Sequence, residues 1–127
     1  MDTFEFFNNG QFVLPEKEAD FAGIAWSKHP TFEGVELKHM ITARDTEGQF
    51  SYHLVRIAPA CRIGSHIHET QLETHEVIKG SGSCVNAGSV ISYAPGTISI
   101  MQAGAAHEVM AGAEGLYLFA KFMPALC

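Results

Sequence analysis

The chain has 127 residues, of which 46% are hydrophobic and 17% are charged, and it carries a formal net charge of −6. This negative charge argues against a protein that binds nucleic acid, because binding to a phosphate backbone needs a basic patch. The apolar runs are only a few residues long, so the sequence predicts no transmembrane span and no membrane partner.

The cysteines and the first residues of the chain bear on its cellular location. Cys61, Cys84 and Cys127 are an odd number, and they lack the short spacings typical of metal-binding cysteines. Reduced thiols are the simplest interpretation. The first residues, MDTFEFF, are acidic and lack the basic start and apolar core of a signal peptide. Together these features predict a cytoplasmic protein.

Residues 1–34 show the weakest pattern, and we expect them to form a mostly irregular N-terminal extension. Three phenylalanines near its start are expected to pack against other parts of the protein, since aromatic side chains rarely gather in water: Phe4, Phe6 and Phe7. The charged residues 16–20 are expected to form a helical turn or a solvated loop. His29 precedes Pro30, which favours extended geometry, and is expected to lie in a surface loop.

From residue 35 onward, short strand-like runs are separated by glycine, proline and asparagine. No long stretch has a helical period. Strands are predicted at 35–42, 50–58, the run through His66 and His68, 73–85, 89–94, 97–103, 107–111 and 116–123, with turns at 43–49, 86–88, 95–96 and 111–115. This spacing is typical of an all-β barrel or sandwich. The length predicts one domain, residues 1–127, with the β-barrel at 35–127.

Four side chains are candidate metal ligands. His66 and His68 are two residues apart, so on a strand both imidazoles point to the same face. Glu73 follows a short polar loop and could supply an oxygen ligand, and His107 lies on a later strand-like run. Three imidazoles and one carboxylate suit a divalent transition metal such as Fe, Mn, Ni or Zn, and contain too much nitrogen for Ca or Mg.

The spacing of the first three candidates also carries a resemblance. The pattern H-x-H-x4-E-x6-G resembles the first motif of the cupin family and is complete here, with His66, His68, Glu73 and Gly80. The resemblance implies a small jelly-roll barrel, also called a double-stranded β-helix, with a metal ion inside one mouth.

A second cupin motif, G-x5-P-x-G-x2-H-x3-N, is matched in part. Gly96, Gly104 and His107 stand at its positions, whereas Gln102 replaces the proline and Ala111 replaces the asparagine. Both replacements fall on turn and packing positions rather than on the ligand. The resemblance therefore implies that His107 completes the ligand set.

Four further side chains are candidates for a catalytic role. His75 lies two residues beyond Glu73, so it is either a further ligand or a partner that orients one. His53 lies on one face of the predicted strand at 50–58, and Tyr52 and Arg56 lie on the other. If the Tyr52 face lines the barrel, Tyr52 and Arg56 could hold an anionic or hydroxylated substrate. If the opposite face does, His53 could act as a general base or an orienting residue.

An octahedral ion with three histidine ligands and one glutamate ligand keeps two positions for a small-molecule substrate, or for substrate and dioxygen together. With iron this predicts a dioxygenase. With Zn, Ni or Mn, the ion would act as a Lewis acid in an isomerase or lyase. A protein that binds a small ligand without catalysis, with a structural metal, is a further alternative.

Charged residues are distributed unevenly along the chain. No Asp, Glu, Lys or Arg occurs at residues 81–107. Alternate residues of these strands should face outward, and an uncharged outer face is commonly covered. We therefore expect a homodimer or a larger homo-oligomer, which the cupin resemblance also implies.

Overall fold

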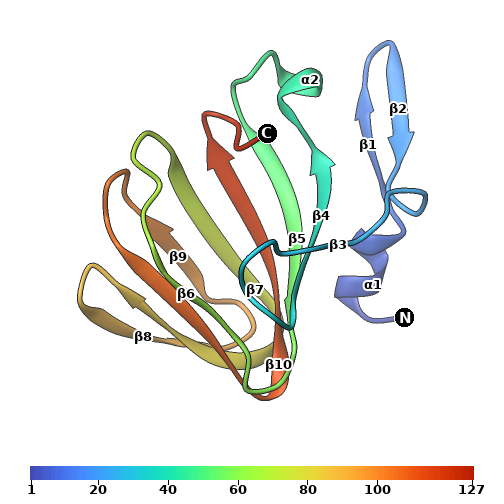
Figure 1. The fold of residues 1–127 in the computed structure, drawn as a ribbon. Coiled ribbons are helices and arrows are strands. Elements are labelled where there is room, and N and C mark those ends of the chain that lie inside the picture. Colours follow the sequence, from blue (N-terminus) through green and yellow to red (C-terminus); the bar gives the residue numbers. More distant parts are fainter.

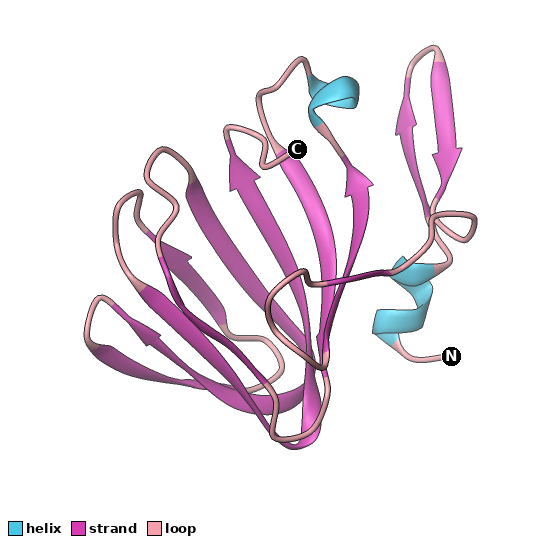
Figure 2. Cartoon of the chain, viewed as in Figure 1, coloured by secondary structure: helices cyan, strands magenta, loops and turns pink.

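The computed structural model describes residues 1–127, which form two antiparallel sheets and two short helices (Figures 1 and 2). Neither helix is long enough to cross a membrane. The strands of the large sheet are β3 Ser27–Lys28, β4 Val35–Ile41, β5 Ser51–Ile57, β6 Arg62–His66, β7 Leu72–Asn86, β8 Ser89–Tyr93, β9 Ile98–Met101 and β10 His107–Met123. The all-β class and jelly-roll architecture predicted from the sequence are confirmed.

The N-terminal extension contains more regular structure than its sequence pattern suggested. Helix α1, Thr3–Asn8, is followed by a hairpin of β1, Gln11–Leu14, and β2, Lys17–Asp20. The prediction of a helical turn or loop at residues 16–20 was therefore wrong for residues 17–20, which pair with β1 after a tight turn at Pro15 and Glu16.

A second short helix stands where the sequence predicted only a turn. Helix α2, Ala43–Thr46, begins at a capping box, in which the Asp45 carboxylate accepts a hydrogen bond from the backbone amide of Thr42 at 3.0 Å. It ends at Glu47, whose left-handed backbone (φ 54°) closes the helix. The turn residues at 43–49 thus encode one helical turn between β4 and β5.

Two long strands, β7 and β10, pair along most of their length and belong to both layers of the barrel. The half of β10 at residues 116–122 pairs with β5, whereas residues 107–110 pair with β6. Similarly, β9 and β8 pair with opposite halves of β7. The predicted turn at 111–115 is instead a bend inside one strand (Figure 1).

Glycines permit this bend, because the two strands approach too closely for side chains. A Cβ atom on Gly80 would lie 2.1 Å from the Gly115 carbonyl oxygen, and one on Gly82 would lie 2.2 Å from that of Met110. Three extra residues of β10 are accommodated between the pairs Ala111–Gly82 and Leu116–Gly80.

The protein has two groups of buried apolar side chains, one inside the barrel and one outside it. The interior group includes Val55, Leu118 and Phe122. The outer group lies between the N-terminal extension and the sheet, and contains Phe4, Phe21, Met40, Leu54 and Phe119. Of the three N-terminal phenylalanines expected to pack, Phe4 is buried and Phe7 contacts Phe119, but Phe6 is 65% exposed.

Candidate metal centre

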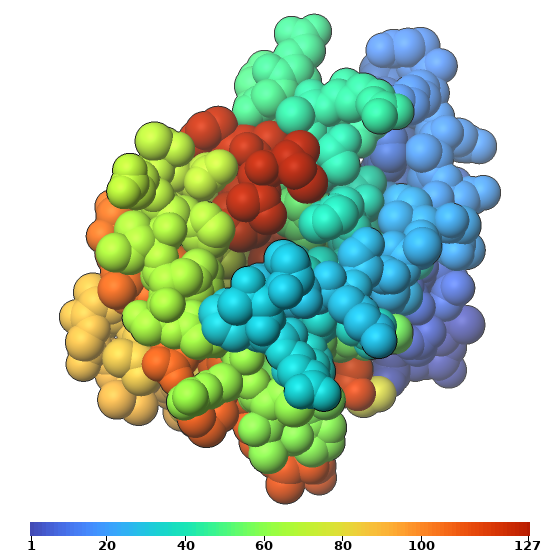
Figure 3. All heavy atoms as spheres, viewed as in Figure 1, coloured from blue at the N-terminus to red at the C-terminus, as the bar shows by residue number.

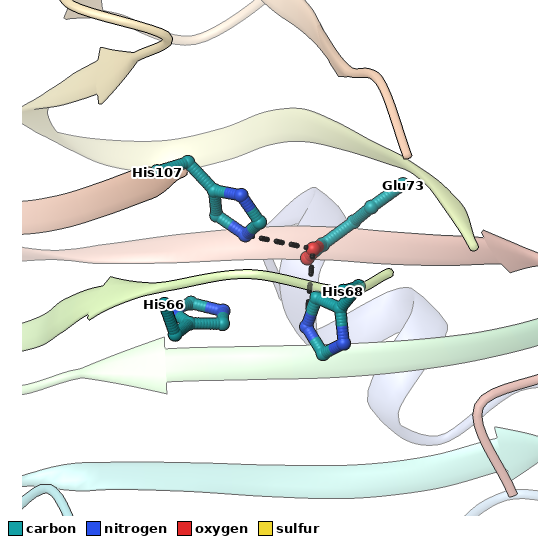
Figure 4. Close-up of side chains that lie close together, drawn as sticks. All are labelled: His66, His68, Glu73 and His107. Atoms are coloured by element: carbon teal, nitrogen blue, oxygen red, sulfur yellow. Dashed lines mark ion pairs between the residues drawn. The ribbon is translucent and has the colours of Figure 1, made fainter. Parts of the chain in front are cut away.

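Four predicted ligands from three parts of the chain converge inside the barrel (Figure 4). His66 ends β6 and pairs with His107, the first residue of β10. His68 follows β6 in the loop, and Glu73 lies near the start of β7. Each offers one ligand atom, and these atoms all lie within 4.8 Å of one another. The strand pairing thus brings together residues that are up to 41 positions apart in the sequence.

Glu73 lies at the centre of the group. Its Oε1 atom is 3.0 Å from Nε2 of His107 and 3.6 Å from Nε2 of His68. His66 completes the ring of side chains, with its ring centroid 4.2 Å from that of His107 and 5.0 Å from that of His68. Glu73 and His107 are buried, whereas His66 and His68 are half-buried toward the mouth.

Backbone carbonyls orient two of the imidazoles. Nδ1 of His66 donates to the Gly64 carbonyl at 2.9 Å, and Nδ1 of His107 donates to the Ala105 carbonyl at 3.2 Å. A neutral imidazole that donates through Nδ1 carries a lone pair at Nε2. These bonds therefore leave the Nε2 atoms as the candidate metal-binding atoms.

The arrangement fits a cation. Glu73 Oε1 and His107 Nε2 are both buried and lack a hydrogen-bond partner of suitable geometry. Two such acceptor atoms 3.0 Å apart repel each other unless a proton or metal ion lies between them. Three imidazoles with one carboxylate are a donor set for Fe, Mn, Ni or Zn.

The pKa shifts of three of the four residues favour the protonation states that bind a metal ion. Burial would raise the pKa of the Glu73 carboxyl, but His107 and His75 hold it well below its ordinary value, so Glu73 is an anion. Burial lowers the pKa of His66 and of His68, which keeps both imidazoles neutral and able to bind a metal. His107 is different, since Glu73 raises its pKa in spite of burial. Without a metal, a proton on His107 therefore balances the Glu73 charge.

His75 contacts Glu73 from the opposite side. Its Nε2 donates to Glu73 Oε2 at 2.7 Å, and its Nδ1 accepts from the Tyr93 hydroxyl at 2.9 Å. The sequence left two roles open for His75, a further ligand or a residue that orients a ligand. This geometry is that of a residue that orients a ligand. The bond leaves Oε1 of Glu73 facing the other histidines.

A pocket of about 110 Å³ opens beside the centre. Its remaining walls are apolar side chains, including Ile63, Val109 and Phe122. His29 also lines it, although the sequence suggested only a surface loop and offers no pattern that would reveal the contact. On the face drawn in Figure 3, the loop before β4 (cyan), the segment around β6 (yellow-green) and the end of the chain (red) surround this region.

The remaining catalytic candidates lie away from the four ligands. The His53 face of β5 lines the barrel, and His53 is fully buried, but its ring contacts His39 and Phe122 rather than the centre. Tyr52 and Arg56 lie on the opposite face, because β5 alternates. Arg56 pairs with Glu36, and Tyr52 lies under the Lys121 ammonium. The structure therefore does not bring Tyr52 or Arg56 to the pocket.

No protein-family model matches the sequence, and no curated protein does. Solved structures do match. A predicted oxalate decarboxylase from Thermotoga maritima has a TM-score of 0.75 at 18% identity, over 81% of this chain and 95% of that one. KdgF from Halomonas sp. has a TM-score of 0.70 at 16% identity, over 79% of this chain and 86% of that one.

A third similar structure is described as a cupin domain. The cupin domain of Cnp3 from Schizosaccharomyces pombe has a TM-score of 0.71 at 9% identity, over 85% of this chain and 77% of that one. At such identities the likeness is one of fold, and it agrees with the fold that the two sequence motifs implied. The chain therefore has the fold of the cupin superfamily.

Proposed function

We propose that this protein is a metal-dependent enzyme that acts on a small organic molecule, and that its reaction is of the dioxygenase type. The observation that supports a bound metal is the pair formed by Glu73 Oε1 and His107 Nε2, which are buried, 3.0 Å apart and have no partner beyond this group of side chains. His66 and His68 supply two further imidazoles to the same point.

The pocket supports the choice of reaction. Apart from Glu73 and four histidines, every side chain that lines it is apolar. His75 is already engaged by Glu73 and Tyr93, so the walls offer little acid–base chemistry of their own. A divalent ion at this centre would supply Lewis-acid chemistry and, if it is iron, redox chemistry. The apolar walls exclude water from the substrate and select a molecule with a compact apolar part.

A non-oxidative lyase is the second candidate, and His29 favours it. Nδ1 of His29 accepts hydrogen bonds from the backbone amides of Thr31 and Phe32, at 3.1 and 3.2 Å. The proton of the neutral ring therefore lies on Nε2, and His29 can donate it to a bound substrate. The name of the oxalate decarboxylase with the same fold also supports such chemistry.

The metal is tested first. The protein is reconstituted with Fe(II) without oxygen, and the bound iron is measured. The expected result is one iron per chain in the parent and in Tyr52→Phe, but none in a variant that combines His66→Ala with His68→Ala. Equal iron in all three proteins would overturn the proposal.

The reaction is tested next, with a panel of small molecules that present two adjacent oxygen donors, such as diols, diketones and hydroxy acids. Dioxygen uptake that needs both Fe(II) and one panel member supports a dioxygenase. Turnover without dioxygen, reduced in His29→Phe, supports the lyase instead. Iron binding with no turnover of any kind contradicts both candidates.

A further inference from the structure

A second cluster of metal-ligating side chains lies at the same end of the barrel. His39 on β4 and His53 on β5 are neighbours in the antiparallel pairing, and Cys127 lies beside them. One ligand atom from each residue lies within 4.8 Å of the other two. None of these residues belongs to the first centre.

Three hydrogen bonds fix the segment that carries Cys127. The amide of Ala125 donates to the Gly48 carbonyl at 3.0 Å, and the amide of Leu126 donates to the Ser51 hydroxyl at 2.8 Å. The carbonyl of Cys127 itself accepts from the amide of Ala43 at 2.7 Å. These bonds fix the backbone that carries the Cys127 thiol beside the two histidines.

His53 is oriented as metal-binding histidines are. Its Nε2 lies 2.8 Å from the Ser51 hydroxyl, while its Nδ1 lies 2.8 Å from Nδ1 of His39. When Nε2 donates to Ser51, Nδ1 carries a lone pair that accepts a hydrogen bond from Nδ1 of His39, and a metal ion would take the place of that proton. Burial lowers the pKa of His53 to about 4, which keeps the ring neutral.

An aromatic side chain separates the two centres. The ring of Phe122 lies 5.5 Å from that of His53 and 5.1 Å from that of His68. Because no hydrogen bond crosses Phe122 between the two groups, each can be occupied by its own ion.

We propose that His39, His53 and Cys127 form a second metal site, which binds Zn²⁺ or a similar late first-row divalent ion. Two imidazoles and a thiolate favour such ions over Mg²⁺ or Ca²⁺. The two imidazole nitrogens must separate from 2.8 Å to about 3.3 Å, the spacing that tetrahedral zinc bonds require. Cys127 binds as the thiolate and its proton passes to water, and a fourth position stays open for water or another ligand.

A thiolate ligand gives this site a signature that the first centre cannot produce. The metal-stripped full chain is titrated with Co²⁺, and thiolate-to-metal charge-transfer absorption is recorded in the near ultraviolet. The expected band reaches its maximum at one thiolate-bound Co²⁺ per chain and disappears when Zn²⁺ is added. Absence of the band from the parent protein overturns the proposal.

Variants then assign the band. It should be lost in Cys127→Ser and in His39→Ala, and retained in Cys61→Ser, which alters another incompletely buried thiol. The band should also be retained in the variant that combines His66→Ala with His68→Ala and so lacks the first centre. The test of the second site is therefore independent of the test of the first. Circular dichroism confirms that each variant is folded. A band that persists in Cys127→Ser, or one that is lost in Cys61→Ser, contradicts the assignment.

Discussion

The two carboxylate oxygens of Glu73 have different surroundings. Oε2 accepts a hydrogen bond from His75, and His75 is in turn held by the hydroxyl of Tyr93. Oε1 has no hydrogen bond of suitable geometry and lies against Nε2 of His107 and Nε2 of His68. The chain from Tyr93 through His75 to Glu73 therefore fixes the direction of the proposed oxygen ligand, although neither Tyr93 nor His75 need touch the ion.

Removal of the Tyr93 hydroxyl should weaken metal binding. In Tyr93→Phe, His75 loses the donor to its Nδ1 atom and is free to change tautomer, so it no longer holds Oε2 firmly. Loss of such an orienting bond typically weakens metal affinity by about 10-fold or more. Competition with a chelator measures the dissociation constant for Fe(II) or Mn(II).

A matched tyrosine on the outer face provides the control. Tyr52→Phe removes the same hydroxyl from a side chain that lies on the outer face of β5 and packs against Phe50 and Lys121. It should leave the metal affinity unchanged. Equal weakening in both variants would mean that Tyr93 acts only through general stability.

His53 predicts a dependence of stability on pH. Burial, together with the charge of His39, lowers its pKa from 6.5 to about 4. The unfolded chain therefore binds the proton more tightly than the folded protein does. The stability that the neutral ring contributes is fully present above pH 6.5 and is lost as the pH falls toward 4, by at most about 3 kcal/mol.

Denaturation by urea at pH 7 and pH 4.5, with chelator present, measures this change. His53→Gln keeps a polar side chain but cannot titrate, so its free energy of unfolding should fall less over this range than that of the parent. The other histidines with lowered pKa values contribute equally to both proteins. Identical losses in the two proteins would show that His53 is not the titrating group.

At the residue scale, spacing predicted much of the candidate site and missed the rest for a physical reason. Two cupin motifs singled out His66, His68, Glu73 and His107, because the spacing within each motif accompanies one barrel geometry. His29 was missed because its contact with the pocket depends on how the loop before β4 packs. His39, His53 and Cys127 match no motif with a known spacing, so only the folded structure brings them together.

At the scale of elements, the strands β7 and β10 determine where the site lies. Each contributes to both layers, and each bends where glycines face the partner strand. Glu73 lies in one half of β7, and His107 begins the half of β10 that pairs with β6. The bend thus positions a carboxylate from one layer against imidazoles from the other.

A methyl group at this bend should destabilise the fold. In Gly82→Ala, the new Cβ atom would lie 2.2 Å from the carbonyl oxygen of Met110, a backbone atom that cannot move without disturbing the strand pairing. Such overpacking typically costs about 1–3 kcal/mol, and we expect a value at the upper end. Thermal and urea denaturation of the metal-free protein provide the measurement.

Gly23→Ala is the matched control, because no atom lies within 4 Å of its added Cβ and its φ is not positive. Its stability should equal or slightly exceed that of the parent, since alanine restricts the unfolded chain. If Gly82→Ala were as stable as Gly23→Ala, the close approach of the strands would not be what requires glycine there.

Most strands were predictable, because alternation of apolar and polar residues directly reflects a half-buried sheet. The errors arose where tertiary contacts determine the structure. Residues 111–115 resemble a turn by composition, yet the pairs on either side, Ala111 with Gly82 and Leu116 with Gly80, keep them within β10. The hairpin at 11–20 and the helix at 43–46 are short, and their patterns are weak at that length.

At the scale of the whole molecule, the uncharged segment at residues 81–107 leaves apolar side chains in contact with water. Val90 on β8 is 77% exposed, and Ile98 and Ile100 on β9 are 66% and 54% exposed. Val85 and Met110 are also exposed. Val90 and the two isoleucines lie in different layers, because β8 and β9 pair with opposite halves of β7. Ile98 and Ile100 share the outer face of β9, and an exposed apolar sheet face is commonly covered by another chain. The homodimer expected from the sequence stays a prediction, with this face of β9 as its interface.

A charge placed on this surface should separate the subunits. We expect the parent protein to elute at twice the mass of the chain in size-exclusion chromatography with light scattering, and Ile98→Glu to elute as a monomer. Burying an unpaired carboxylate in an apolar interface costs several kcal/mol, enough to dissociate a micromolar dimer. The same change at Phe6, which is 65% exposed on the N-terminal extension, should leave the dimer intact. A parent protein that elutes as a monomer would contradict the dimer. A dimer that withstands Ile98→Glu but not Phe6→Glu would place its interface on another surface.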